Sequence, residues 1–412
     1  MNFDFLRNCN FLAWPVYGLC ALLPLSIAGI SIFKLITILT ALVVLLAALA
    51  AGRRLLELRT APTILALCML GALAASLTYT SVSLTEALSA LTKYGKLLLI
   101  PAIAVLIRSR AQAITALRVY FCTQIFVLLT SWLLFAGLNL PWVPTDRCAV
   151  AAVYSCYLDQ AMLTAGFAAI AWHLRADFPT RYGPIFAVSM AAVAVLNVLF
   201  ALPGRTGQIC LFAAIAVSIW WVMPRKLRPL AVLAPVVAFA LATLLSTQFN
   251  QRYSEVISEV KAYQSNTGDH LTTSSGQRLG YWQKSLQAIA EKPMLGYGVG
   301  TWRQQYWRLE PSAHSSGIAS VRNPHQEFLL WGVQLGSVGV LLVVLWLGSF
   351  WWTSRTFAAP VMRATVSFLA VFVVACLLNS ALYDGLVGDY FCALLALLIA
   401  LGRHTPPVVL RP

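Results

Sequence analysis

The feature that most constrains this chain is a series of long apolar stretches that recur from one end to the other. The chain has 412 residues, of which 60% are hydrophobic and only 10% are charged. A soluble globular protein carries about 25% charged residues, and a membrane-spanning helix needs about 20 apolar residues in a row. We therefore predict an all-α polytopic membrane protein.

A window of that length predicts about twelve transmembrane helices. The predicted spans are 11–29, 31–51, 62–79, 95–107, 115–138, 157–173, 184–202, 207–223, 229–246, 325–351, 359–378 and 388–402. Residues 81–94 have the pattern of a short amphipathic helix that leads into the fourth span. No small-residue cleavage pattern and polar segment follow the first stretch, so we interpret it as a span and not as a signal peptide.

The charged residues between the spans predict the orientation of the chain. Lys and Arg accumulate in cytoplasmic loops, and a cytoplasmic N-terminus places more than half of the 29 basic residues on that side, with few of the 14 acidic ones. Both termini are then cytoplasmic. The short turns at 139–156, 203–206 and 379–387 face outward, as does the long polar segment 247–324.

That polar segment divides the chain into three parts. Residues 1–246 and 325–412 are predicted membrane helices, and 247–324 is an outer loop domain between them. The loop has too few apolar residues to form a large core of its own. We expect it to contain short helices, one of which begins with a capping box made by Ser274 and Gln277.

The net charge of +15 does not indicate a nucleic-acid partner. The basic residues punctuate apolar runs and form no block or stripe, so we expect membrane lipids and no nucleic acid around this chain. Most of the nine cysteines lie in or beside apolar segments, as small packing residues do. Cys148 and Cys156 flank an outward-facing stretch, which leaves a disulfide between them open.

The sequence lacks the residue spacings that bind catalytic metals. We find no CxxC pair, no HExxH motif and no carboxylate cluster with ligand spacing. Such patterns are typical of zinc and calcium sites. We therefore predict a site without a metal ion or another cofactor.

The strongest candidate for a functional residue is His325, at the boundary between the outer loop and the tenth predicted span. Asn323 fits an N-cap and Pro324 fits the first helical position, which would place His325 in the first turn. Free N–H groups and the positive end of the helix dipole disfavour an imidazolium there. The neutral ring can act as a general base or only hydrogen-bond the loop, and the local sequence favours neither.

Four arginines are predicted on the same outer side. Arg205 and Arg147 lie in short outer turns, where positive charge is normally rare. Arg278 lies in the first turn of the loop helix, and Arg322 lies just before His325. Because guanidinium groups match the geometry of phosphates, these residues predict an anionic lipid headgroup or a diphosphate as ligand.

Other residues nearby have structural interpretations that compete with functional ones. Arg303 and Arg308 fit loop salt bridges. Asp389, near the outer end of the last span, can orient a base, bind a sugar hydroxyl or cap its own helix. Gly332 and Gly336 form a small-xxx-small pair, which favours close helix packing.

The residues that begin at His325 resemble a family signature. His325 and Gln326 are followed by nine residues and then by Gly-Ser-Val-Gly-Val at 336–340. This is similar to the signature of bacterial O-antigen ligases, in which His precedes Asn, Ser or Gln, and Gly-x-x-Gly-(Thr/Val) follows after nine residues. The resemblance therefore rests on both residue type and spacing.

Upstream residues extend this resemblance to roughly residues 200–345. Arg278, with Tyr281 and Trp282 after it, and the glycine-rich stretch 295–300 are similar to the rest of the shared ligase–polymerase domain. Arg205 is similar to the arginine that precedes a span in that family. O-antigen polymerases and protein O-oligosaccharyltransferases share this layout, so the motif indicates the superfamily more firmly than the activity.

The resemblance implies an enzyme, a glycosyltransferase that acts at the periplasmic face of the bacterial inner membrane. Its donor would be O-antigen on undecaprenyl diphosphate, and its acceptor would be the core oligosaccharide of lipid A. A polymerase would use another lipid-linked repeat unit as acceptor. A membrane transporter is the less favoured alternative, because few ionisable residues lie within the spans.

The resemblance and the outward charges together assign roles to the candidate residues. His325 is the predicted general base of an inverting, metal-independent transfer. The predicted residues for the donor diphosphate are Arg205, Arg278 and Arg147. Residues predicted to orient or contact substrate are Gln326, Asp389 and Arg322.

Overall fold

The computed structural model consists of helices, without strands, in the part of the chain that it describes. The described residues are 10–53, 55–177, 180–245, 247–265, 273–311 and 321–405. A helix satisfies its backbone polar groups within one segment, which is what an apolar stretch in a bilayer requires. The predicted class, an all-α polytopic membrane protein, is confirmed.

Nine helices among the described residues are long and apolar enough to cross a membrane. They are α3 (Ile27–Ala50); α4 (Ala61–Ala75) with η3 (Ser76–Thr78); α5 (Leu84–Lys93) with η4 (Tyr94–Leu98) and α6 (Leu99–Leu106); α7 (Arg110–Phe135); α9 (Gly183–Leu196) with η6 (Asn197–Ala201); α10 (Arg205–Val222); α15 (Glu327–Ser354); α16 (Ala359–Leu378); and α17 (Gly385–Arg403). The interior of the bundle is occupied by α17, which is the most deeply buried of these helices.

Three of the predicted spans form shorter helices. These are α2 (Trp14–Leu22) after η1 (Asn10–Ala13), α8 (Tyr157–His173), and α11 (Leu233–Leu245) after η7 (Arg225–Val232). Most of the 17 residues of α8 are buried, so this helix belongs to the interior of the bundle. The total of about twelve spans stays a prediction. Two further short turns are η2 (Leu56–Arg59) and η5 (Arg175–Asp177).

The predicted boundary between the first two spans, at residue 30, is wrong. The helix α2 ends at Leu22 and α3 begins at Ile27. Pro24 lies between them, and its missing N–H and closed ring disfavour a continuous helix. Ser26 then acts as the N-cap of α3, with its hydroxyl accepting the Gly29 N–H at 3.1 Å. The break is therefore set by local backbone chemistry within an unbroken apolar run.

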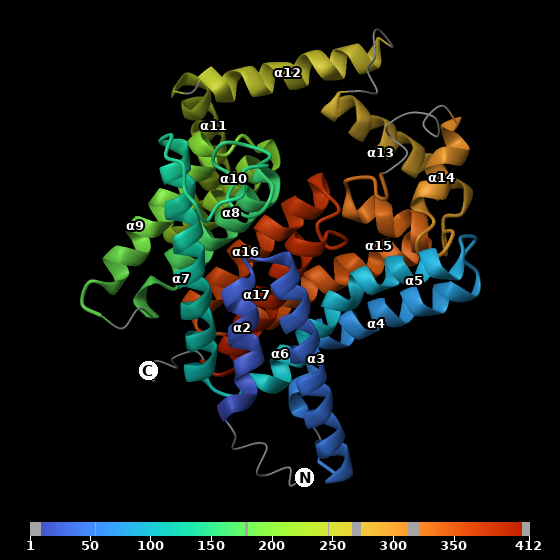
Figure 1. Ribbon diagram of the computed structural model, residues 1–412, viewed down its shortest axis with the longest axis horizontal. Helices are drawn as coiled ribbons and strands as arrows, with labels where there is room; N and C mark the ends of the chain where they lie inside the picture. The colour runs from blue at the N-terminus through green and yellow to red at the C-terminus, as the bar shows by residue number, and fades with distance from the viewer. Residues whose placement is uncertain are drawn as a thin grey trace.

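The segment predicted to be an outer loop domain forms three helices, α12 (Thr247–Gln264), α13 (Ser274–Glu291) and α14 (Trp302–Leu309). In Figure 1, α12 crosses the top of the view from α11 to α13. The predicted capping box is wrong by one residue. The N-cap of α13 is Thr273, whose hydroxyl accepts the Gly276 N–H at 3.2 Å, because the chain is still extended at Thr273 and is already helical at Ser274.

The helix α15 is interrupted at Gly336, which has φ +61° and ψ −150°. The loop 293–300 docks against this interruption. Tyr297 N–H donates to Val333 O at 2.9 Å, and Gly298 N–H donates to Gln334 O at 2.8 Å. In the other direction, the Ser337 N–H donates to the Pro293 carbonyl at 2.7 Å. The loop thus satisfies backbone groups that would otherwise be left unpaired at the break.

Only glycine fits at this contact. The backbone angles of Gly336 fall in a region that residues with a side chain rarely adopt, and an added Cβ would lie 2.5 Å from the Met294 carbonyl oxygen. The interpretation of Gly336 as a helix-packing residue is therefore wrong. Gly332 does pack closely, since a Cβ there would meet the Ile289 side chain of α13 at 2.5 Å.

Candidate active site

His325 lies in the loop that precedes α15, and not in the first helical turn as predicted. The helix begins at Glu327, with Gln326 as N-cap. His325 has φ +51°, the left-handed region, and its N–H donates to the Asn323 side chain at 2.9 Å. The Asn323 carboxamide therefore stabilises a turn and does not cap the helix. His325 therefore lies outside the first turn of α15, so the predicted effect of the helix dipole on its ring does not apply.

A hydrogen bond fixes the tautomer of the His325 ring. Its Nδ1 lies 3.0 Å from the side-chain oxygen of Asn379. The same oxygen accepts the Ser380 N–H at 2.9 Å, and because a backbone N–H can only donate, this atom is the oxygen and not the nitrogen of the carboxamide. The proton therefore sits on Nδ1 of His325, and Nε2 carries the free lone pair.

The environment of His325 favours the neutral ring. Burial lowers its pKa, as does the positive charge of Arg278, and these causes outweigh the opposing effects of the Asn379 hydrogen bond and of Asp384. The Tyr281 ring lies beside the imidazole, with the two centroids 6.2 Å apart. The predicted neutral histidine thus follows from desolvation and not from the helix terminus.

The loop 379–384, which carries Asn379, is anchored by a buried acid. Glu327 accepts the Leu382 and Tyr383 N–H groups at 2.9 and 3.1 Å on one carboxyl oxygen, and the Trp331 indole N–H at 2.8 Å on the other. Glu327 is fully buried, so these bonds replace its lost hydration. Glu327 therefore helps to hold the loop that carries Asn379, the hydrogen-bond partner of His325.

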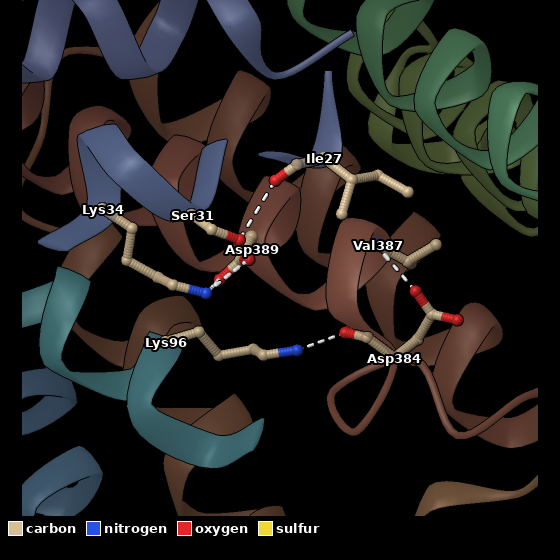
Figure 2. A network of polar contacts seen from close by, with 7 residues as sticks. All are labelled: Ile27, Ser31, Lys34, Lys96, Asp384, Val387 and Asp389. Atoms are coloured by element: carbon tan, nitrogen blue, oxygen red, sulfur yellow. Dashed lines mark hydrogen bonds and ion pairs between the residues drawn. The ribbon is translucent and has the colours of Figure 1, made fainter. Parts of the chain in front are cut away.

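One lysine, Lys96, anchors the far end of the same loop, and Lys34 pairs with the helix that follows it, as Figure 2 shows. The Lys96 ammonium donates to the Asp384 carbonyl oxygen. The Asp384 carboxylate accepts the Val387 N–H at 3.1 Å and so caps α17. Asp389 pairs with Lys34 at 2.7 Å. Of the interpretations offered for Asp389, helix capping is wrong, because Asp384 occupies that position.

Arg278 lies close enough to both His325 and Arg205 for their charges to interact. Burial lowers the pKa of Arg278, and the positive charge of Arg205 lowers it further. Tyr157 and Glu259 act in the opposite direction. Two guanidinium groups held near each other in a partly desolvated position repel, and a bound anion would relieve this repulsion. The pair therefore has the electrostatics of an anion site.

The other predicted residues lie in different surroundings. Gln326 uses its side chain to cap α15, accepting the Leu329 N–H at 2.5 Å. Arg147 lies between α7 and α8, and the described residues show no contact that joins it to His325. Arg303 pairs with Glu86 at 2.6 Å and Arg308 pairs with Glu291, which confirms both predicted loop salt bridges.

Two further predictions concern cysteine and metal sites. Cys148 and Cys156 are both free thiols in the structure, so the disulfide left open by the sequence is not formed. Within the described ranges, no group of three or more His, Cys, Asp or Glu residues is arranged to hold a metal ion. Metal independence itself stays a prediction.

Sequence reasoning missed Asn379, the residue that holds Nδ1 of His325. A single Asn at the end of a span carries no motif, and 54 residues separate it from the histidine. The one available signal was its position in a predicted outer turn. That turn, the turn at 203–206 and the loop 247–324 were all predicted to face outward. The structure joins Asn379 to His325, and it places Arg278 near both His325 and Arg205.

These observations define the class of protein. The chain is a multi-pass helical membrane protein in which Arg278 lies near both His325 and Arg205. Residues 190–344 match the family model described as O-antigen ligase. The predicted resemblance to the O-antigen ligase superfamily is thereby confirmed over these residues.

A curated relative supports the same assignment. The chain is 30% identical over 132 residues to a general O-oligosaccharyltransferase of Acinetobacter baylyi (strain ATCC 33305 / BD413 / ADP1). The aligned region covers 31% of this chain and only 22% of the relative. The two comparisons together support a glycosyl-transferring enzyme of the O-antigen ligase type.

Proposed function

We propose that this protein transfers O-antigen from undecaprenyl diphosphate to the core oligosaccharide of lipid A at the periplasmic face of the bacterial inner membrane. The observation that carries the proposal is a basic imidazole nitrogen, Nε2 of His325, next to Arg278, which in turn lies next to Arg205. Such a site offers a proton acceptor for a hydroxyl and an anion site for a diphosphate. Both termini are then cytoplasmic.

The chemistry follows from these groups. Nε2 of His325 takes the proton from an acceptor hydroxyl as its oxygen attacks the anomeric carbon of the donor sugar. The bond from that carbon to the diphosphate oxygen breaks, and its electron pair leaves with the diphosphate. Arg278 and Arg205 stabilise the charge on the leaving group. A single in-line displacement inverts the configuration, and the arginines supply the positive charge that a metal ion would otherwise provide.

An apolar cavity supports a polyisoprenoid donor. The cavity has a volume of about 660 Å³ and lies between α8, α9 and α10. On α10 its lining extends from Leu211 to Met223, so it begins six residues after Arg205, or about 9 Å along the helix axis. A lipid whose diphosphate is held at Arg205 would extend its isoprenoid chain along α10 into this cavity.

The direct test is a reconstituted reaction. Purified protein in liposomes is incubated with lipid-linked O-antigen and lipid A–core, and the product is followed as a larger lipopolysaccharide on a gel. We expect product without added divalent cations. Absence of product with both lipid substrates present would contradict the proposal.

The arginine pair is expected to matter more than other arginines on the same side. Arg278→Ala and Arg205→Ala should each lower the transfer rate on the order of 10²-fold, the cost of losing one group that stabilises a leaving charge. Arg308→Ala is the matched control, because Arg308 pairs with Glu291 at the surface. Equal effects in all three variants would refute the special role of the pair.

The pH dependence of transfer should report on His325. The base works only when neutral, and its pKa lies below the ordinary value of about 6.5, so the rate should be constant near pH 7 and fall at lower pH. Asn379→Asp places a carboxylate on the Nδ1–H, which stabilises the imidazolium and raises that pKa. The acid limb of kcat/KM against pH should then move to higher pH.

Ser380→Ala is the control for this shift. Ser380 accepts the Gln326 N–H with its hydroxyl but does not bond the histidine ring through its side chain. The acid limb should stay where it is in this variant. An unchanged limb in Asn379→Asp would show that another group titrates in the profile.

A second candidate function is transfer to a different acceptor. The curated relative is named as a general O-oligosaccharyltransferase, which favours a protein acceptor, and a polymerase would use a second lipid-linked repeat unit. Deletion of this gene separates the possibilities. Long chains that remain on the carrier lipid favour a ligase, shortened chains favour a polymerase, and loss of protein-linked glycan favours an oligosaccharyltransferase.

A further inference from the structure

A second group of cations lies near His325, apart from the arginine pair. Arg322 and Arg303 line a small polar cavity together with Glu86 and Tyr383. The cavity measures about 20 Å³, room for about one water molecule. Lys93 lies beside it, with its ammonium 4.1 Å from the centre of the Tyr383 ring. Three positively charged side chains therefore meet around one cavity.

The acids near this group compensate only part of its charge. Glu86 is paired with Arg303 at 2.6 Å, and Asp384 uses its carboxylate to cap α17. Asp384 attracts Lys93, while Arg322 and Lys93 repel each other. Arg322 is exposed, and no ion pair of Arg322 with a described residue is found. Positive charge therefore exceeds negative charge around the cavity, and the Arg322 guanidinium is exposed there.

The position of the cavity places it beside the reacting groups. Arg322 lies three residues before His325, and Tyr383 lies in the loop that holds the histidine ring through Asn379. Asp384 acts electrostatically on both His325 and Lys93. The Arg278 side chain acts electrostatically on His325, and Arg322 acts on Lys93. His325 thus adjoins two distinct groups of cations.

We propose that Lys93 and Arg322 form a second anion site, which binds a phosphate group carried by the sugar acceptor. This rests on the proposed function, in which the arginine pair holds the diphosphate of the donor. A transferase for two lipid-linked substrates must hold each in register with the base, and a separate cation group near His325 suits the second one. Phosphorylated sugars on a lipid and anionic phospholipid headgroups share this chemistry, and the experiment distinguishes them.

The test compares two acceptors, a phosphorylated lipid-linked oligosaccharide and the same molecule after enzymatic dephosphorylation. Binding to protein in nanodiscs of zwitterionic lipid is measured without donor, so that the result does not depend on turnover. The wild type should prefer the phosphorylated acceptor. In the Lys93→Gln/Arg322→Gln variant, the ratio of the affinities for the phosphorylated and the dephosphorylated acceptor should fall about tenfold, since two charge-assisted hydrogen bonds are removed.

Two further variants exclude general effects of charge and folding. Lys261→Gln/Lys292→Gln removes the same charge from exposed positions of the loop domain and should keep the preference. Lys93→Arg/Arg322→Lys retains both charges and should keep most of it. A double glutamine variant that binds both acceptors as the wild type does would overturn the inference.

The lipid composition separates the two sources of phosphate. If anionic phospholipid in the nanodiscs abolishes the preference of the wild type, the site takes lipid headgroups and the inference is wrong. Wild-type protein that binds the phosphorylated acceptor selectively but transfers no glycan would refute the proposed function and leave the anion site standing. Transfer of glycan without any preference for the phosphorylated acceptor would refute the anion site and leave the proposed function standing.

Discussion

His325→Ala is expected to lower the transfer rate by about 10² to 10⁴-fold, the usual contribution of a general base. The structure gives the physical reason, since Nδ1 is engaged by Asn379 and Nε2 retains the lone pair. The alanine variant still binds both substrates, so the loss should appear in kcat more than in KM. Single-turnover transfer between the two lipid substrates measures it directly.

His404→Ala is the control for removal of a histidine. His404 follows α17 at the opposite end of that helix from Asp384 and Asn379, so its loss should leave transfer near the wild-type rate. A rate for His325→Ala within a factor of two of wild type would refute the assignment of the base. His325→Gln, which keeps a polar side chain without a basic nitrogen, should be as inactive as the alanine variant.

Gly336→Ala is expected to reduce both stability and activity. Its backbone conformation costs a residue with Cβ on the order of 1–3 kcal/mol, and the new methyl group would also collide with the Met294 carbonyl. Relief of this collision requires the loop 293–300 to withdraw from the break in α15. We expect a lower unfolding temperature in detergent, together with reduced transfer.

Gly348→Ala is the matched control in the same helix. No atom lies within 4 Å of a Cβ built at Gly348, and alanine favours the helix over glycine by roughly 1 kcal/mol. This variant should be as stable as the wild type or more so. Equal unfolding temperatures for the two alanine variants would contradict the role assigned to the break.

The class of the fold could be predicted from apolar stretches because span length is set by the bilayer. Helix ends depend instead on local backbone chemistry within those stretches. Pro24 and Ser26 divide an apolar run that reads as continuous, and Thr273 takes the capping position from Ser274. The break at Gly336 escaped prediction because its cause is the loop 293–300, which pairs with α15 only in the folded chain.

The candidate site was predictable where a residue was unusual for its place. An arginine in a short turn predicted to face outward, such as Arg205, is conspicuous because loops on that side normally lack positive charge. Asn379 was not conspicuous, since asparagine is common in turns. The conformation of His325 was mispredicted because Asn323 and Pro324 also fit a turn that stops short of the helix.

The break in α15 also has a mechanical consequence. A continuous helix would transmit its tilt to both ends, and membrane helices tilt as the bilayer thickness changes. The loop 293–300 is bonded to α15 on both sides of the break, to Val333 and Gln334 before it and to Ser337 after it. The first nine residues of the helix, from Glu327 to Leu335, are also tied to the loop 379–384 through Glu327. A change of tilt beyond Gly336 would therefore be passed to the loop 293–300 and not only along the helix towards His325.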